Sequence, residues 1–184
     1  MVRKLSIILV IGLLAFTAAC SSSSSSTVNS ASANSNASVV ATATPAACPT
    51  KNTESFAKTK FVADVAVAGG AFKRYIYTPA KDGKFKKGAN GRVLAFVKAA
   101  AAGALTVNRL EAAKTAAQAN PTLCKLLAEP IARFSAAVSG LIGKAKGGSI
   151  DPSDVSNASS YLTDLHGAAS QGGAAFTDNT DTSA

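Results

Sequence analysis

Histidine and cysteine, the residues that most often carry catalysis and metal binding, are scarce in this 184-residue sequence. His166 is the single histidine, beside three cysteines and no tryptophan. A Ser–His or Cys–His nucleophile pair would have to use His166. Two of the cysteines, Cys48 and Cys124, with that one distant histidine make a poor zinc ligand set. The sequence therefore carries no recognisable catalytic constellation.

Carboxylates are also few, with 10 Asp and Glu against 19 Lys and Arg. Metal sites in helical bundles use Glu and Glu-x-x-His sets on facing helices. The glutamates lack that spacing; they are Glu54, Glu111 and Glu129. We predict no enzyme, no catalytic residues, no metal site and no cofactor. An enzyme would need a cleft that brings Glu111, Glu129 or Asp64 next to His166.

The N-terminal hydrophobic run is too short for a permanent membrane-spanning helix. The N-terminal apolar stretch from Leu5 to Phe16 has about a dozen residues, against roughly 20 needed to cross a bilayer. It follows Arg3 and Lys4 and leads into the small residues at 17–19. This order is typical of an export signal, which we assign to residues 1–19.

The tetrapeptide TAAC at residues 17–20 resembles the lipobox of bacterial lipoproteins, although Thr17 stands where that family usually carries an aliphatic residue. The resemblance implies that Cys20 is acylated and becomes the mature N-terminus. Two or three acyl chains, at about 0.8 kcal/mol per buried methylene, would make a durable anchor. We therefore expect an extracytoplasmic protein on the bacterial cell membrane. The alternative is a secreted protein in which Cys20 is incidental.

The segment after Cys20 is built from Ser, Ala, Asn and Thr and has no charged residue up to position 47. Such a composition cannot bury enough apolar surface to offset its ordering entropy. We predict a flexible tether over residues 20–50, whose 27 residues at 21–47 reach at most about 95 Å.

Cys48 and Cys124 remain once Cys20 is assigned to the lipid. Exported proteins fold in an oxidising compartment, so a single pair of cysteines predicts a disulfide. Closing the chain between Cys48 and Cys124, a loop of about 77 residues, stabilises a fold by about 4 kcal/mol in the chain-entropy model. A metal site is the competing interpretation.

Four segments with helical apolar spacing predict an all-α domain, an antiparallel up-down four-helix bundle over residues 51–172. The first two expected helices cover about 54–78 and 91–119. The third opens at Pro121 and ends at Gly147-Gly148, and the fourth opens at Pro152 and carries its stripe to Ala169. Their predicted core stripes are Phe61, Val65, Ala68, Phe72 and Tyr75; Val93, Val97, Ala100, Ala104 and Val107; Leu127, Ile131, Phe134, Val138 and Leu141; and Val155, Ala158, Leu162, Leu165 and Ala169. The second helix is expected to be central and the most buried. Residues 173–184 are expected to form a disordered tail.

Individual residues refine these boundaries. Pro79 is expected to end the first helix, and Pro130 to kink or break the third. Asn120 and Asp151 are expected caps. Gly69-Gly70 predicts a packing notch or a local bend in the first helix.

Basic residues concentrate between positions 73 and 98, where only Asp82 opposes them. We predict an anionic-surface binding site formed by Lys73, Arg74, Lys81, Lys84, Lys86, Lys87 and Arg92. Outside the cytoplasm the partner would be acidic phospholipid or a cell-wall polymer, and nucleic acid fits the charge but not the compartment. The alternative is a solvated face without a binding role.

Two further stretches, CPTKNTESFAKTKF (48–61) and NPTLCKLL (120–127), resemble uncharacterised actinobacterial secreted proteins and lipoproteins. That resemblance implies a helical fold and an envelope location and adds no activity. We hypothesise a lipid-anchored binding or envelope-structural module, with a small amphiphile or lipid carrier holding its ligand in an interhelical cavity as the alternative. The oligomeric state is not predicted.

Overall fold

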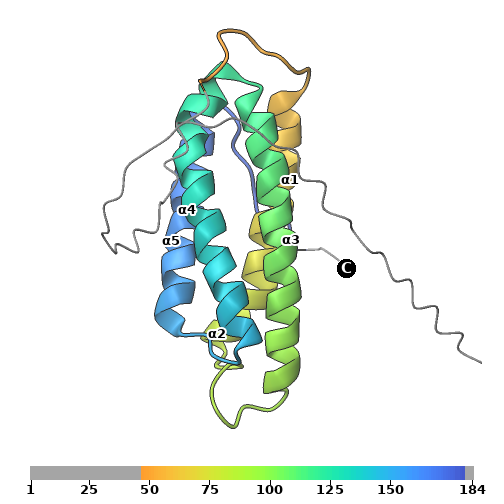
Figure 1. The fold of residues 1–184 in the computed structure, drawn as a ribbon, viewed down its shortest axis with the longest axis vertical. Coiled ribbons are helices and arrows are strands. Elements are labelled where there is room, and N and C mark those ends of the chain that lie inside the picture. The colour runs from red at the N-terminus through yellow and green to blue at the C-terminus, as the bar shows by residue number, and fades with distance from the viewer. Residues whose placement is uncertain (1–46, 181–184) are drawn as a thin grey trace, which may run out of the picture. The chain divides into compact units, whose positions relative to one another are not determined.

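The computed structural model describes residues 47–180, so the predicted signal, Cys20 and nearly all of the predicted tether lie outside the described residues. The regular secondary structure of residues 47–180 is entirely helical, which confirms the all-α prediction (Figure 1). Its elements are α1 (Ala57–Phe72), the π-helix η1 (Lys73–Tyr77), α2 (Thr78–Lys81), α3 (Arg92–Gln118), α4 (Pro121–Lys146) and α5 (Pro152–Gln171).

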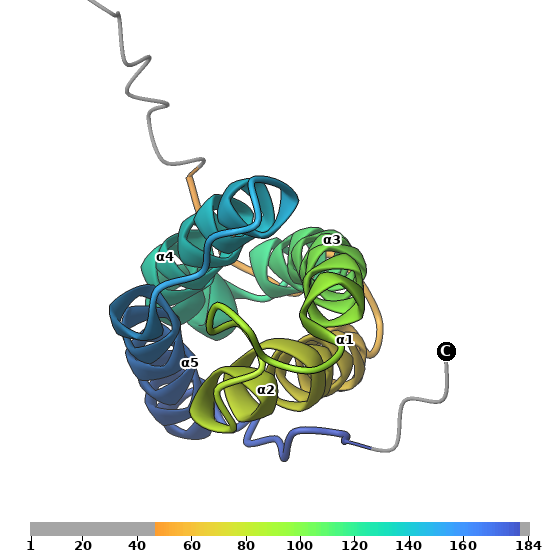
Figure 2. The ribbon, with the colours of Figure 1, turned by 90° about the horizontal axis from the view of Figure 1, so that it is seen from below.

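The long helices pack side by side around one hydrophobic core. Helix α3 contacts α1 and α4, and α4 contacts α5. Viewed along the helices, α1, α3, α4 and α5 surround a common centre (Figure 2). The predicted stripes of α4 and α5 are buried in full, as are Phe61, Val65, Ala68 and Phe72 of α1. Of the described helices, α3 and α4 are long and apolar enough to cross a membrane by length and composition alone.

The predicted core stripe of α3 is wrong. Val93 and Val97 are 77% and 60% exposed, and the buried face instead contains Phe96, Ala99 and Leu110. Alanines and valines occupy most of the helix circumference, so periodicity alone does not choose a face. The buried face includes the aromatic ring of Phe96. Nine of the 27 residues of α3 are buried, against eight of the 16 in α1, so α3 is not the most buried helix. It also buries the hydroxyl of Thr106, which donates to the carbonyl oxygens of Ala102 and Ala68.

Pro79 does not end the first helical segment, which continues through α2 to Lys81. Proline lacks an N–H, and its ring clashes with the carbonyl four residues earlier in a regular α-helix. The wider turn of η1 directly before Pro79 relieves this conflict. The N-terminal boundary also differs from the prediction, because Phe56 has a left-handed backbone (φ 60°) and the helix begins at Ala57.

Helix α4 begins as the sequence predicts. The side chain of Asn120 accepts hydrogen bonds from the backbone N–H groups of Thr122 and Leu123, both at 3.0 Å, and Pro121 occupies the first turn. The helix continues through Pro130 without a break. Asp151 stands at the cap position of α5, but its side chain makes no capping hydrogen bond and pairs with Lys144 instead.

The predicted disulfide between Cys48 and Cys124 is present, with the two Cα atoms 5.6 Å apart. The same end of the domain is tied by two further contacts. The Thr53 N–H donates to the Ala119 carbonyl at 3.0 Å, and the Asn120 side-chain amide donates to Asn52 Oδ1 at 2.9 Å. The segment that precedes α1 is therefore fastened to the turn between α3 and α4.

Residues 173–180 were expected to be disordered but pack along α1. Ala174 and Phe176 are buried, and the Asn179 N–H donates to the Ala66 carbonyl at 2.8 Å. The tail passes over Gly69-Gly70, so the predicted notch accommodates the C-terminal segment. The tail prediction failed because this segment has no helical period and gains its order from a surface more than 100 residues earlier in the chain.

A lysine-rich end of the domain as candidate functional site

The loop between α2 and α3, residues 82–91, is held in place by aromatic and guanidinium contacts. Phe85 is buried and packs on Phe96, with ring centroids 5.0 Å apart. The Arg92 guanidinium lies over the Phe96 ring and donates to the carbonyls of Phe85 at 3.0 Å and Gly148 at 2.7 Å. Gly83, Gly88 and Gly91 adopt positive φ and turn the chain. The loop therefore has a defined position despite its polar sequence.

Three of the seven predicted binding residues are engaged within the fold. Lys73 forms an ion pair with the buried carboxylate of Asp178. Arg74 donates to the Thr180 carbonyl at 2.7 Å and lies over the Tyr75 ring. Arg92 anchors the loop. These three basic residues thus have partners within the fold, and the partners of Lys73 and Arg74 lie in the C-terminal tail.

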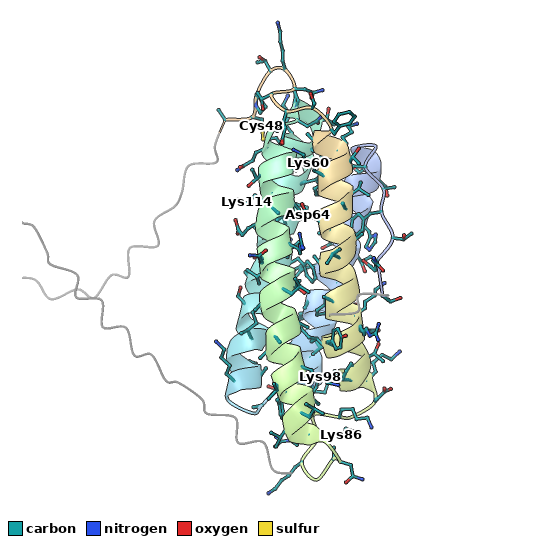
Figure 3. All side chains as sticks on the ribbon, turned by 90° about the vertical axis from the view of Figure 1, so that its right-hand side faces the viewer. Cys48, Lys60, Asp64, Lys86, Lys98 and Lys114 are labelled. Atoms are coloured by element: carbon teal, nitrogen blue, oxygen red, sulfur yellow. A yellow bond between two sulfur atoms is a disulfide. The ribbon has the colours of Figure 1, made fainter. Side chains whose placement is uncertain are left out.

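The other four predicted residues lie together at one end of the domain, where one of them also makes a cation–π contact (Lys81 over the Tyr77 ring, 5.5 Å from its centroid). They are Lys81, Lys84, Lys86 and Lys87, which we call the lysine loop. All four are exposed, and within residues 47–180 none of them has an ion-pair partner. Lys98 is also exposed, and Figure 3 shows it near the same end as Lys86.

Part of the positive charge on the neighbouring side of this end is neutralised. Lys144, in the last turn of α4, pairs with Asp151 and Asp154. The hydrogen bond that Lys144 donates to Asp154 is the main cause that raises the pKa of Lys144 above its usual value. Lys146, in the same turn, is exposed and has no ion-pair partner among residues 47–180, so unpaired positive charge at this end lies on α4 as well as on the lysine loop.

Exposed aliphatic side chains adjoin the lysine loop, and the sequence reasoning did not place them there. Val93, Leu94 and Val97 are 77%, 57% and 60% exposed, in the first two turns of α3. They occupy positions i, i+1 and i+4, which share one helix face. A signal was present, because α3 has more apolar positions than one buried face can hold.

The groups that an enzyme would need do not gather at His166. Asp64 pairs with Arg109 at 3.3 Å, and Glu111 and Glu129 pair with bases on their own helices. The His166 ring instead stacks on Phe176 with centroids 3.9 Å apart, and its Nε2 lies 3.1 Å from the Asp178 carboxylate. The described residues contain no group of three or more His, Cys, Asp and Glu side chains that could hold a metal ion.

An amphiphile carrier would hold its ligand between the alanine-rich helix α3 and its neighbours α1 and α4, and the core that these helices enclose contains aromatic rings. Phe61, Phe72 and Phe134 are fully buried, and the last two meet edge to face with centroids 5.3 Å apart. A cavity of about 360 Å³ is instead lined by residues 52–58 and Asn120, near the disulfide. Nothing in the described residues specifically favours the carrier alternative.

Comparison with known protein families, with curated proteins and with solved structures finds no match to this chain.

Proposed function

We propose that the protein is a lipid-anchored extracytoplasmic helical module that docks on an anionic envelope surface through its lysine loop. The observation that carries the proposal is the exposure of Lys81, Lys84, Lys86 and Lys87 at one end, without ion-pair partners among the described residues. Acylation of Cys20 supplies the attachment and the location.

We further propose an antiparallel up-down four-helix arrangement, which brings the lysine loop to one tip. Short connections of the kind seen here join antiparallel neighbours in bundles. The contacts of Thr53 with Ala119 and of Lys58 with Gly172 support a common end for the start of α1 and the ends of α3 and α5. The contact of Arg92 with Gly148 supports the opposite end for the start of α3 and the end of α4.

In this arrangement the tether and the lysine loop leave opposite tips. Cys48 lies near one end of α3 and Lys86 near the other (Figure 3). The 27 residues of α3 span about 40 Å at 1.5 Å per residue. The proposed tether at residues 21–47 reaches about 95 Å when extended, so it is long enough to run back along the domain. Lipid attachment and lysine docking are therefore sterically compatible.

The expected strength is moderate and sensitive to salt. Each Lys near an anionic membrane contributes about 1 kcal/mol, so the four residues together contribute about 4 kcal/mol. That corresponds to about a thousandfold in the membrane partition coefficient. The attraction weakens as the Debye length falls from about 10 Å at 0.1 M salt to about 3 Å at 1 M.

Vesicle co-sedimentation of the full chain tests the proposal. The triple variant Lys84→Glu, Lys86→Glu, Lys87→Glu is compared with wild type on vesicles with and without phosphatidylglycerol. Both chains carry the same N-terminal residues, so their contribution cancels in the ratio of partition coefficients. We expect the variant to bind anionic vesicles about a hundredfold more weakly and neutral vesicles equally well.

A matched control changes the same charge at the other end of the domain, with Lys51→Glu, Lys114→Glu and Lys125→Glu. All three control lysines are exposed, and one of them, Lys114, pairs with Glu111 at 3.6 Å on its own helix, so the stability of this variant is checked by urea unfolding. Equal loss in both triple variants would reduce the effect to net charge and contradict a specific lysine site. Pull-down with purified wall polymer distinguishes the two anionic partners.

A further inference from the structure

We propose that the exposed apolar face at the start of α3, formed by Val93, Leu94 and Val97, inserts into the interfacial region of an anionic lipid bilayer. The inference rests on the proposed function and deepens it, since it selects phospholipid over wall polymer as the surface that the lysine loop meets.

The first argument is the exposure of these three side chains. Scattered exposed aliphatic residues are normal on proteins, but adjoining ones mark interaction sites. Val93, Leu94 and Val97 adjoin on one helix face, and apart from Phe56 they are the large hydrophobic side chains with the greatest exposure in residues 47–180. Full burial of one such side chain is worth about 1.5 to 3 kcal/mol, which the domain leaves unused in water.

The second argument is that the domain cannot bury this face internally. The opposite side of the same turns already packs inward through Phe96 and Ala99. Phe96 is fixed by Phe85 and by the Arg92 guanidinium. Rotating α3 to bury Val93 and Val97 would expose Phe96 and break both contacts. The apolar face is therefore a fixed part of the surface.

The third argument concerns what covers the face. Lys84, Lys86 and Lys87 precede it in the chain, and Lys98 follows it directly. Aliphatic residues flanked by basic ones are typical of helices that lie in the interface of anionic membranes. The lysines contact headgroups in such an arrangement, while the aliphatic side chains reach the acyl boundary. A wall polymer offers the charge but no apolar phase.

A second copy of this chain fits the face less well. Pairing two apolar faces would bring two lysine loops together, and like charges at an interface cost free energy. Three aliphatic side chains are also a small fraction of the roughly 20 to 30 residues that each partner contributes to a stable interface. Charge complementarity and size therefore both favour lipid.

The absence of tryptophan from the sequence provides a direct test. The substitution Leu94→Trp places the single tryptophan of the full chain on the apolar face. On vesicles containing phosphatidylglycerol, we expect a blue-shifted emission and quenching by lipids brominated on the acyl chains. Both signals should disappear when Lys84, Lys86 and Lys87 are also changed to Glu.

The matched control is Phe56→Trp, at a residue that is 78% exposed near the start of α1. Its emission should stay unshifted and unquenched on the same vesicles. The triple variant Val93→Ser, Leu94→Ser, Val97→Ser should lower the partition coefficient by about 10- to 100-fold, with an unchanged salt dependence.

The outcomes separate the two proposals. Unquenched Leu94→Trp, together with weaker binding on lysine reversal, would overturn insertion and leave lysine docking intact. Lysine reversal without effect on anionic vesicles would overturn insertion, and lysine reversal without effect on both vesicles and the wall-polymer pull-down would overturn both proposals. Sedimentation analysis that shows a dimer in wild type, lost in the triple serine variant, would assign the apolar face to a second copy and overturn insertion.

Discussion

The carbonyl oxygen of Asn179 lies 1.5 Å from the position that a β-carbon on Gly70 would occupy. Any side chain at residue 70 would therefore displace the C-terminal tail from α1. Gly69 stands in the same relation to the Asp178 carboxylate, at 1.9 Å. The pair of glycines forms a seat for the last described residues of the chain.

The substitution Gly70→Ala should release the tail and destabilise the domain by about 1 to 3 kcal/mol, because the overlap is with the backbone of Asn179 and no side-chain rotation can relieve it. Urea unfolding gives the free energy, and faster proteolysis near residue 176 reports tail release. Gly143→Ala is the matched control, since it lies in α4 with open space around it. It should stabilise the protein by about 0.5 to 1 kcal/mol. Equal stability of the two variants would argue against the requirement for glycine at the contact between α1 and the C-terminal tail.

Asp178→Asn should loosen the tail without steric overlap. The carboxylate is 4% exposed and pairs with Lys73, while His166 Nε2 approaches it to 3.1 Å. Lys73 is about half exposed, so solvent screening limits the loss to about 1 to 2 kcal/mol. Hydrogen exchange of the Asn179 amide, which donates to Ala66, should accelerate. Asp164→Asn, an exposed aspartate on α5, should leave that amide unchanged.

Removing the disulfide with Cys48→Ser and Cys124→Ser should lower the free energy of unfolding by about 4 kcal/mol, because the unfolded chain regains the entropy of a long open loop. The measurement is urea unfolding of the double variant beside the oxidised wild type. Wild type in reductant should match the double variant. Unchanged stability in reductant would mean that the cross-link contributes little to this fold.

Arg92→Ala should free the lysine loop from its support. The guanidinium donates to two backbone carbonyls and covers Phe96, so we expect a loss of about 1 to 3 kcal/mol in unfolding free energy. A lysine-specific protease should cut residues 84–87 faster. The control Arg133→Ala removes an exposed pair with Glu129 and should cost less than about 0.5 kcal/mol. Unchanged proteolysis in Arg92→Ala would show that Phe85 alone holds the loop.

The helices whose packing could be predicted from the sequence are those with one apolar face and one charged face. Helix α4 carries Leu127, Ile131 and Phe134 on one side and charged residues such as Glu129 and Arg133 on the other, so its stripe followed from spacing. Helix α3 has alanine or valine on nearly every side of its first half. Its orientation depends on where Phe96 finds a partner, and that partner is Phe85 in a loop.

The candidate site was predicted in part for a similar reason. Charge density alone identified the segment around Lys84, Lys86 and Lys87. Spacing could not show that Lys73 and Arg74 are engaged by Asp178 and Thr180, because the tail gains its place from Gly69-Gly70. The sequence did not predict the exposed apolar face at Leu94, because the predicted core stripe of α3 placed Val93 and Val97 in the core.

The disulfide also determines how the domain would respond to mechanical force. Cys48 is the point at which the described chain enters the domain, and its sulfur is bonded to Cys124 in the first turn of α4. A pull on the preceding residues is carried through this bond into α4. Residues 49–123, which include α1 and α3, form a closed loop that carries no tension from that side while the bond holds. Under the proposed lipid attachment, traction between the membrane and the domain would therefore load a covalent bond before it could separate α1 from the core.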